Sequence, residues 1–164
     1  MSPTDGEPLV DDWQQRVDAL WQEADLDDAE ASTAAMRSLV AELDEDDARG
    51  PFELGGMYDS VGREQEAAEQ YERALSLGLD QERTARLTIQ HASTLRNLGQ
   101  VEEAVALLEA MTPHPSVGSA REAFLALALH ASGRPDQALR VALEGLVPHL
   151  PRYQRSVTAY AAEL

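Results

Sequence analysis

The acidic and histidine side chains are the main candidates for acid–base or metal chemistry in this chain, which has 30 acidic residues, four histidines and no cysteine. No two histidines have the i, i+4 spacing that places two imidazoles on one helix face to bind zinc. His91 falls on the predicted packing face of a helix and is expected to be a hydrogen-bonded core residue. His114 and His149 lie beside prolines in predicted loops. The histidines therefore predict no metal site.

Acidic residues are concentrated in the run from Asp44 to Asp47. Calcium loops need acids spaced along a loop around a glycine turn, and the run lacks that pattern. Carboxylates stabilise a helix N-terminus, so we expect the run to cap the helix that follows it. The sequence predicts no bound metal and no cofactor.

Catalytic motifs are absent from the sequence. There is no glycine-rich phosphate loop and no nucleophile elbow, and Gly55-Gly56 falls inside an expected helix with no strand before it. Glu53 and Asp59 are the carboxylates best placed for general acid–base chemistry, and we expect both to be solvated and to titrate normally. No residue is predicted to be catalytic, and the chain is not expected to be an enzyme.

The net charge of −17 restricts the partners. Residues 1–50 carry 15 acids against three arginines, and all 13 basic residues of the chain are arginine. Such a field repels phosphates of nucleic acids and anionic membrane surfaces. Solubility explains the charge most simply, and attraction of a basic partner or mimicry of nucleic acid is the alternative. Without a signal peptide or a ~20-residue apolar run, we expect a cytoplasmic location.

Helical periodicity runs through the chain. Three glycines, Gly62, Gly99 and Gly133, each close one amphipathic segment and open another, at intervals of 37 and 34 residues. A small residue follows each glycine by five positions, and these are Ala67, Ala104 and Ala138. No alternating run of β-branched residues predicts a strand. A period of this size is typical of stacked helical hairpins, so the fold class is all-α.

These segments, which read GREQEAAEQYERAL, GQVEEAVALLEAM and GRPDQALRVALEGL, resemble the tetratricopeptide repeat family, and within it the small bacterial type with three repeats. Related helical-hairpin solenoids remain an alternative. The resemblance implies a right-handed repeat solenoid of about nine helices in one compact domain. Its expected parts are a flexible tail (1–8), an N-terminal helical hairpin (9–44), repeats at 48–79, 82–111 and 117–147, and a C-terminal capping helix (151–163). The hairpin is a cap or a degenerate repeat, and we expect Trp13 and Trp21 to be buried in it.

The first helix of repeat 1 has weak helix propensity, because Gly50, Gly55 and Gly56 each cost roughly 0.5–1 kcal/mol relative to alanine. Packing by residues such as Phe52 and Tyr58 must therefore stabilise it. We expect it to be the least stable helix of the array.

In this family the first helix of each repeat lines a concave groove in which partner peptides lie. Carried over by position, the resemblance implies a groove formed by Arg49, Phe52, Gly56, Asp59, Ser60, Arg86, Ile89, Ser93, Arg96, Asn97, Ala120, Ala123, Leu127, His130 and Ala131. Arg86, Arg96 and Asn97 are predicted to hold an acidic peptide or a C-terminal carboxylate, because arginine pairs with carboxylates in a bidentate manner. Alternatively, these arginines pair with nearby acids such as Glu53 or Glu82. The family's chaperone-binding members use lysine in their carboxylate clamp, and this chain has none.

The function implied is that of an adaptor that binds a protein or peptide segment in its groove. Two alternatives stay open. One is a structural or regulatory homo-oligomer, for example a homodimer, assembled through the N-terminal hairpin. The other is an acidic decoy for a basic or nucleic-acid-binding protein. The sequence does not choose between them.

Overall fold

The computed structural model describes residues 12–164, and this part of the chain consists of nine α-helices with two short 3₁₀ turns and no strand. The helices are α1 (Asp12–Glu23), α2 (Ala29–Val40), α3 (Arg49–Ser60), α4 (Glu64–Leu77), α5 (Gln81–Asn97), α6 (Val101–Ala110), α7 (Ala120–Ala131), α8 (Pro135–Leu146) and α9 (Gln154–Ala161). The predicted tail at 1–8 lies outside the described residues, as does the start of the predicted 9–44 hairpin. The all-α repeat architecture is confirmed.

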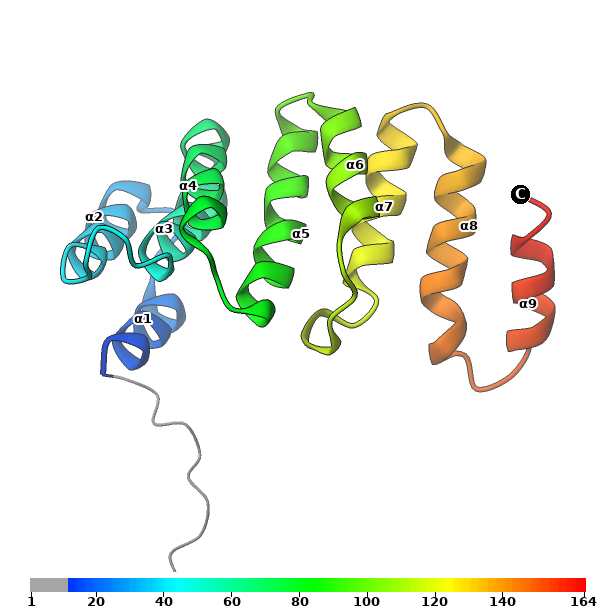
Figure 1. Cartoon of the computed structure of the whole chain (residues 1–164), viewed down its shortest axis with the longest axis horizontal. Coiled ribbons are helices and arrows are strands. Elements are labelled where there is room, and N and C mark those ends of the chain that lie inside the picture. The colour runs from blue at the N-terminus through cyan, green and yellow to red at the C-terminus, as the bar shows by residue number, and fades with distance from the viewer. Residues whose placement is uncertain (1–11) are drawn as a thin grey trace, which may run out of the picture.

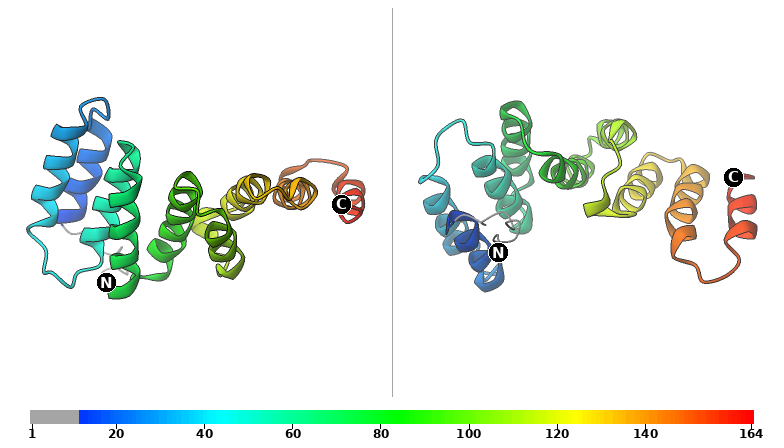
Figure 2. Two further views of the ribbon diagram at one scale, coloured as in Figure 1. Left: turned by 90° about the horizontal axis from the view of Figure 1, so that it is seen from above. Right: turned by 60° about the horizontal axis from the view of Figure 1, so that its bottom comes forward.

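Each helix packs against the next one in the chain, so the array is a single curved row with α1 and α9 at opposite ends (Figure 1; Figure 2). The first helices of successive pairs also meet: α5 contacts both α3 and α7, and α1 reaches α3 through Trp21. Within the described residues, the second helices α4, α6 and α8 do not pack closely on one another. The layer of first helices is therefore the tighter, inner side of the curve.

The three hairpin glycines form the same turn. Gly62, Gly99 and Gly133 have φ of 75°, 82° and 77°, a region that costs an L side chain energy and glycine little. After each glycine, a backbone N–H closes a six-residue loop to a helix carbonyl: Arg63 to Tyr58 (2.8 Å), Gln100 to Leu95 (2.9 Å) and Arg134 to Leu129 (2.9 Å). This is the Schellman motif, which satisfies carbonyls that a helix end would leave unpaired.

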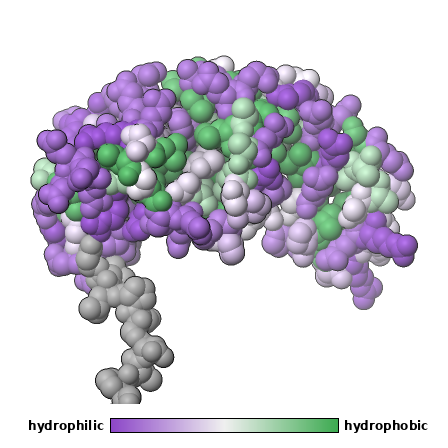
Figure 3. All heavy atoms as spheres, in the orientation of Figure 1, coloured by the Kyte–Doolittle hydropathy of each residue, from purple (hydrophilic) through white to green (hydrophobic). Residues whose placement is uncertain are grey.

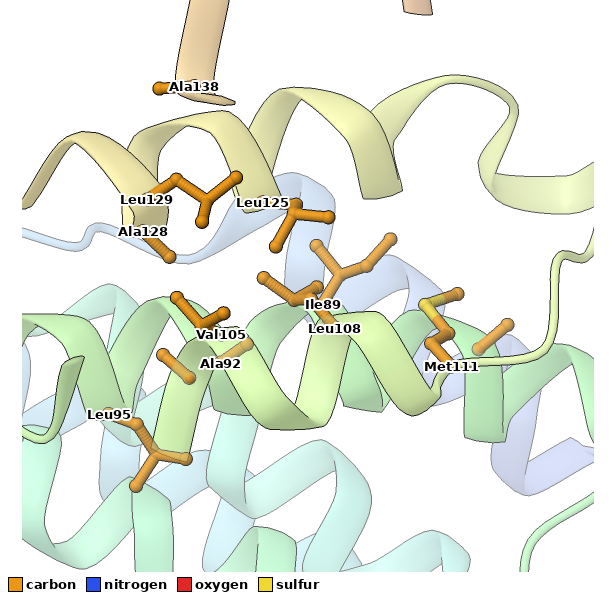
Figure 4. Packing of buried hydrophobic residues seen from close by; sticks show 12 residues of the cluster. Ile89, Ala92, Leu95, Val105, Leu108, Met111, Leu125, Ala128, Leu129 and Ala138 are labelled. Carbon is orange, nitrogen blue, oxygen red and sulfur yellow. The ribbon is translucent and has the colours of Figure 1, made fainter. Parts of the chain in front are cut away.

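Apolar side chains form a continuous interior along the row. One cluster joins α1 and α2 to α3 through Trp13, Val17, Met36 and Met57, and Trp13 donates its indole N–H to the Leu39 carbonyl oxygen at 2.8 Å. The largest cluster lies between α5, α6, α7 and α8 (Figure 4). Trp13 is therefore buried as predicted, whereas Trp21 is only partly buried.

Close packing explains the glycines of α3. A Cβ on Gly55 would lie 2.7 Å from two ring atoms of Tyr71, and a Cβ on Gly50 would lie 3.0 Å from Val40. Small residues at these positions let α3 approach α4 and α2, so packing offsets the weak helix propensity. The low stability predicted for this helix remains a prediction.

The C-terminal end of the row buries fewer of its apolar side chains. Ala161 is the one buried residue of α9. Exposed large apolar side chains gather on α7, α8 and α9 and on the segments after α8 and α9, and these are Leu127, Leu139, Leu146, Tyr153, Tyr160 and Leu164. Hydrophilic residues cover much of the face seen in Figure 3, with hydrophobic residues between them along the row. No helix of the described part is long and apolar enough to cross a membrane.

Candidate binding groove

Helices α1, α3 and α5 enclose a pocket of about 250 Å³ on the inner layer. Its lining residues are Trp21, Phe52, Glu53, Gly56, Asp59, Ser60, Arg86 and Gln90. Five of them, Phe52, Gly56, Asp59, Ser60 and Arg86, are residues that the family resemblance places in the groove. The structure thus gathers part of the predicted set around one opening, which we call the groove pocket.

Glu53 is the most buried acid of the groove pocket, with 7% of its surface exposed. The Trp21 indole N–H donates a hydrogen bond to Glu53 Oε2 at 2.8 Å. Burial raises the pKa of this carboxyl, while the Trp21 hydrogen bond and the charges of Arg86 and Arg83 oppose the rise and Asp18 adds to it. The expectation of a solvated, ordinary Glu53 was therefore wrong.

Asp59 departs from the same expectation. It is partly buried, and its Oδ1 accepts a hydrogen bond from the Thr94 hydroxyl at 2.9 Å. Burial raises its pKa, the Thr94 hydrogen bond opposes the rise, and the charge of Glu64 adds to it. The groove pocket thus contains two carboxyl groups for which ionisation is costly.

Arg86 lies at the edge of the groove pocket with its guanidinium 5.5 Å from the centre of the Phe52 ring, in a cation–π contact. It forms no ion pair or hydrogen bond with the described residues 12–164. The alternative of a direct ion pair with Glu53 or Glu82 is thus not seen, although the Arg86 charge does act on Glu53.

Arg96 is not brought together with Arg86. The two are ten residues apart on α5, about 15 Å along a helix, so they cannot grip one carboxylate. Arg96 donates to Asn97 Oδ1 at 3.2 Å, and its buried Nε has no partner in the described part of the chain. The predicted set of Arg86, Arg96 and Asn97 therefore does not form one clamp.

Other predicted groove residues lie away from the groove pocket. Ile89 is buried in the core cluster, and Arg49 stacks 5.0 Å from the centre of the Trp13 ring while pairing with Asp47 at 2.7 Å. Ser93 is partly buried on α5, and Leu127 and His130 are exposed on α7. Sequence position thus predicts the helix of each residue better than its orientation.

Trp21 and Gln90 were missed as groove residues, and Glu53 was considered there only as a solvated acid and left out of the predicted set. Trp21 belongs to the N-terminal hairpin, which the family pattern did not cover. Glu53, Gly56 and Ser60 are spaced i, i+3, i+7, the spacing of one helix face, and this is the signal that could have identified Glu53.

His91 is buried at 6% exposed, as predicted, but the predicted hydrogen bond is absent: neither ring nitrogen has a partner among residues 12–164. Its ring centroid lies 5.8 Å from that of Tyr71, whose buried hydroxyl also has no partner there. Burial lowers the pKa of His91, and the charges of Glu72 and Glu103 act in the opposite sense. Residues 12–164 contain no group of three histidine or acidic side chains that could hold a metal ion.

A second, more apolar pocket of about 430 Å³ lies between α5, α6 and the segment that follows α6. Leu79, Leu107, Met111 and Pro113 are among its lining residues. It shares no lining residue with the groove pocket and lacks acidic side chains.

Comparison with known proteins identifies one family. A family model described as "Tetratrico peptide repeat" matches residues 48–164, which include α3 to α9. No curated protein matches the chain. The matched part contains every groove-pocket residue except Trp21.

Proposed function

The chain belongs to the tetratricopeptide repeat family, and we propose that it is a cytoplasmic adaptor that binds a segment of another protein along the inner layer of α1, α3, α5 and α7. The family is one of non-enzymatic protein-interaction repeats. The groove pocket carries the proposal, because it combines aromatic walls with two polar groups, the Arg86 guanidinium and the buried Gln90 Oε1, that form no hydrogen bond with the described residues.

Arg86 suits a role at the mouth of this groove. It is exposed, and its cation–π contact with Phe52 leaves its guanidinium N–H groups free of bonds to the described residues. Interface anchors in proteins are enriched in arginine and aromatic residues. A bound segment that crosses α5 would meet Arg86 and the groove pocket together.

The test is quantitative capture of partners from the native lysate by the wild-type protein and by Arg86→Glu. Arg155→Glu is the matched control, because Arg155 lies on exposed α9 and the charge change is identical. We expect Arg86→Glu to change the amount of the principal partner that is captured and Arg155→Glu to leave it unchanged, with both variants keeping wild-type helicity by circular dichroism. Equal capture by the three proteins would contradict binding in the groove.

Self-association is the second candidate function. The apolar residues Trp13, Val17 and Met36 of the N-terminal hairpin pack against Met57 of the same chain, whereas exposed apolar side chains gather from α7 to α9. Any contact between copies would therefore find more apolar surface at the C-terminal end of the row. Sedimentation equilibrium of the wild type and Tyr160→Ser distinguishes the two roles: a dimer weakened by Tyr160→Ser favours self-association, and a monomer favours the adaptor.

A further inference from the structure

We propose that the groove pocket receives a lysine or arginine side chain of the bound protein segment, with its positive charge between the carboxyl groups of Glu53 and Asp59. The inference rests on the proposed function, and it gives the partner segment a basic rather than an acidic anchor residue.

Gly56 lines the groove pocket, and we call its position on α3 the floor of the pocket. Glu53 and Asp59 each lie three residues from it on α3, one helical turn to either side. Because Gly56 has no side chain, no methyl group fills the space between its backbone and the Trp21 ring. A Cβ at this position would lie 3.4 Å from the Trp21 ring, an ordinary contact, so an alanine would fill the floor without displacing its neighbours.

Each carboxyl group keeps one oxygen for a ligand. Trp21 bonds to Glu53 Oε2 and Thr94 bonds to Asp59 Oδ1. Glu53 Oε1 and Asp59 Oδ2 accept no hydrogen bond from any residue between 12 and 164. Ammonium and guanidinium groups are donors only, so they complement acceptor oxygens of two carboxyl groups that line the same pocket.

The charge balance favours the same ligand. Arg86 and Arg83 lower the pKa of Glu53, yet burial outweighs them and the pKa stays raised. For Asp59, burial likewise outweighs the Thr94 hydrogen bond. Arg86 and Arg83 thus compensate Glu53 only in part, no arginine acts on the pKa of Asp59, and a bound cation would supply further positive charge. The net charge of −17 attracts a basic segment at longer range.

An anionic ligand fits this site less well. Among residues 12–164, Arg86 is the one cation that lines the groove pocket, and its guanidinium lies over Phe52. A carboxylate inside the pocket would face Glu53 and Asp59, and like charges in a partly buried site repel strongly. The acidic peptide predicted from the arginines is therefore the competing outcome of the test.

The dimensions suit one side chain. The volume of about 250 Å³ is below the ~300–1,000 Å³ of pockets for drug-sized ligands. Trp21 and Phe52 provide aromatic walls, which can hold the aliphatic stem of a lysine or arginine and attract its charged end.

The experiment is an NMR titration of the full chain with four capped tripeptides, acetyl-Gly-X-Gly-amide with X as arginine, lysine, glutamine or glutamate. The indole N–H of Trp21 reports on the groove pocket through its bond to Glu53, and that of Trp13, bonded to Leu39, is the internal reference. We expect the arginine and lysine peptides to shift the Trp21 signal saturably and to leave Trp13 unchanged. The glutamine and glutamate peptides should produce no saturable shift.

Two variants test whether the site is the one described. Gly56→Ala fills the floor and Glu53→Gln removes one charge, and each should weaken binding of the cationic peptides by about tenfold, the cost of roughly one charge-assisted hydrogen bond. Glu82→Gln, an exposed change on α5, should bind like the wild type.

The inference is overturned if the cationic peptides leave Trp21 unchanged, if the glutamate peptide binds as well as they do, or if Gly56→Ala and Glu53→Gln keep full affinity. Partner capture that depends on Arg86 while the cationic peptides fail to bind would leave the adaptor function standing and remove only the basic anchor. If partner capture does not depend on Arg86 and the cationic peptides also fail to bind, the adaptor function is contradicted as well.

Discussion

Trp21 of α1 donates its indole N–H to the buried carboxyl group of Glu53 on α3, with 2.8 Å between Nε1 and Oε2. This bond joins the N-terminal hairpin, outside the matched residues 48–164, to the first helix inside them. The hairpin therefore contributes a wall of the groove pocket as well as covering the end of the array.

Replacing Trp21 by phenylalanine should keep the aromatic wall and leave Glu53 without its donor. The pKa of Glu53 should then rise further, and the free energy of unfolding at pH 7 should fall by about 1–3 kcal/mol, the usual cost of a buried acceptor without a partner. Urea denaturation gives the value. Adding Glu53→Met to Trp21→Phe should recover most of the loss, because no buried charge then remains. A single variant as stable as the wild type would mean that solvent replaces the indole.

Glu53→Gln should change how stability depends on pH. The folded-state pKa of Glu53 lies above its ordinary value of 4.5, so between those two values the native state binds more protons than the unfolded state. The free energy of unfolding of the wild-type protein therefore falls as pH rises through that window. Glutamine does not titrate, so the variant should be more stable relative to the wild type at pH 7 than below 4.5.

Urea unfolding of both proteins at the two pH values measures this difference. The same groups face position 53 in both proteins, namely Trp21, Arg86, Arg83 and Asp18. Asp59 also titrates in both proteins, so the contributions of these groups to the pH dependence of stability largely cancel. A pH-independent difference between wild type and variant would argue against a raised pKa.

His91→Leu should stabilise the protein by about 1 kcal/mol, because it replaces a buried imidazole without hydrogen bonds by an apolar side chain. The folded-state pKa of His91 lies below 6.5, so as pH falls under 6.5 the unfolded state binds a proton that the native state does not. The wild type loses stability there, and the gain from leucine should grow. Thermal unfolding at two pH values tests this, and His130→Leu, a change of an exposed residue on α7, is the control that should have little effect.

Gly55→Ala and Gly56→Ala should act in opposite directions on adjacent residues of α3. At Gly55 the new Cβ would lie 2.7 Å from the fully buried Tyr71 ring, so we expect a loss of about 1–3 kcal/mol in spite of the better helix propensity. At Gly56 the nearest contact is 3.4 Å, so alanine should add roughly 0.5–1 kcal/mol of stability. Chemical denaturation of the two variants measures both changes in stability. Equal changes in stability for the two variants would show that helix propensity, rather than the close contact of α3 with α4, determines the effect of the added methyl group.

Local chemistry explains which features the sequence could predict. The turns at Gly62, Gly99 and Gly133 depend on a positive φ that glycine adopts at little cost, so residue type and spacing were sufficient to place them. The helices between them follow from periodic apolar residues, and the observed all-α array agrees with both signals.

Orientation and environment depend on the tertiary structure instead. Helix position alone could not show that Ile89 turns into the core or that Arg49 turns to Trp13. The titration of Glu53 and Asp59 was misjudged for the same reason: a pKa reflects burial and neighbouring charges, and these come from helices far apart in the chain.

The sequence by itself determined the all-α class, the hairpin turns and the acidic charge, because each depends on residue type and local spacing. The tertiary structure decided where the groove pocket lies, which carboxyl groups line it and which arginine reaches it. Those features arise only when α1, α3 and α5, separated by tens of residues, pack side by side and exclude water from the groups between them.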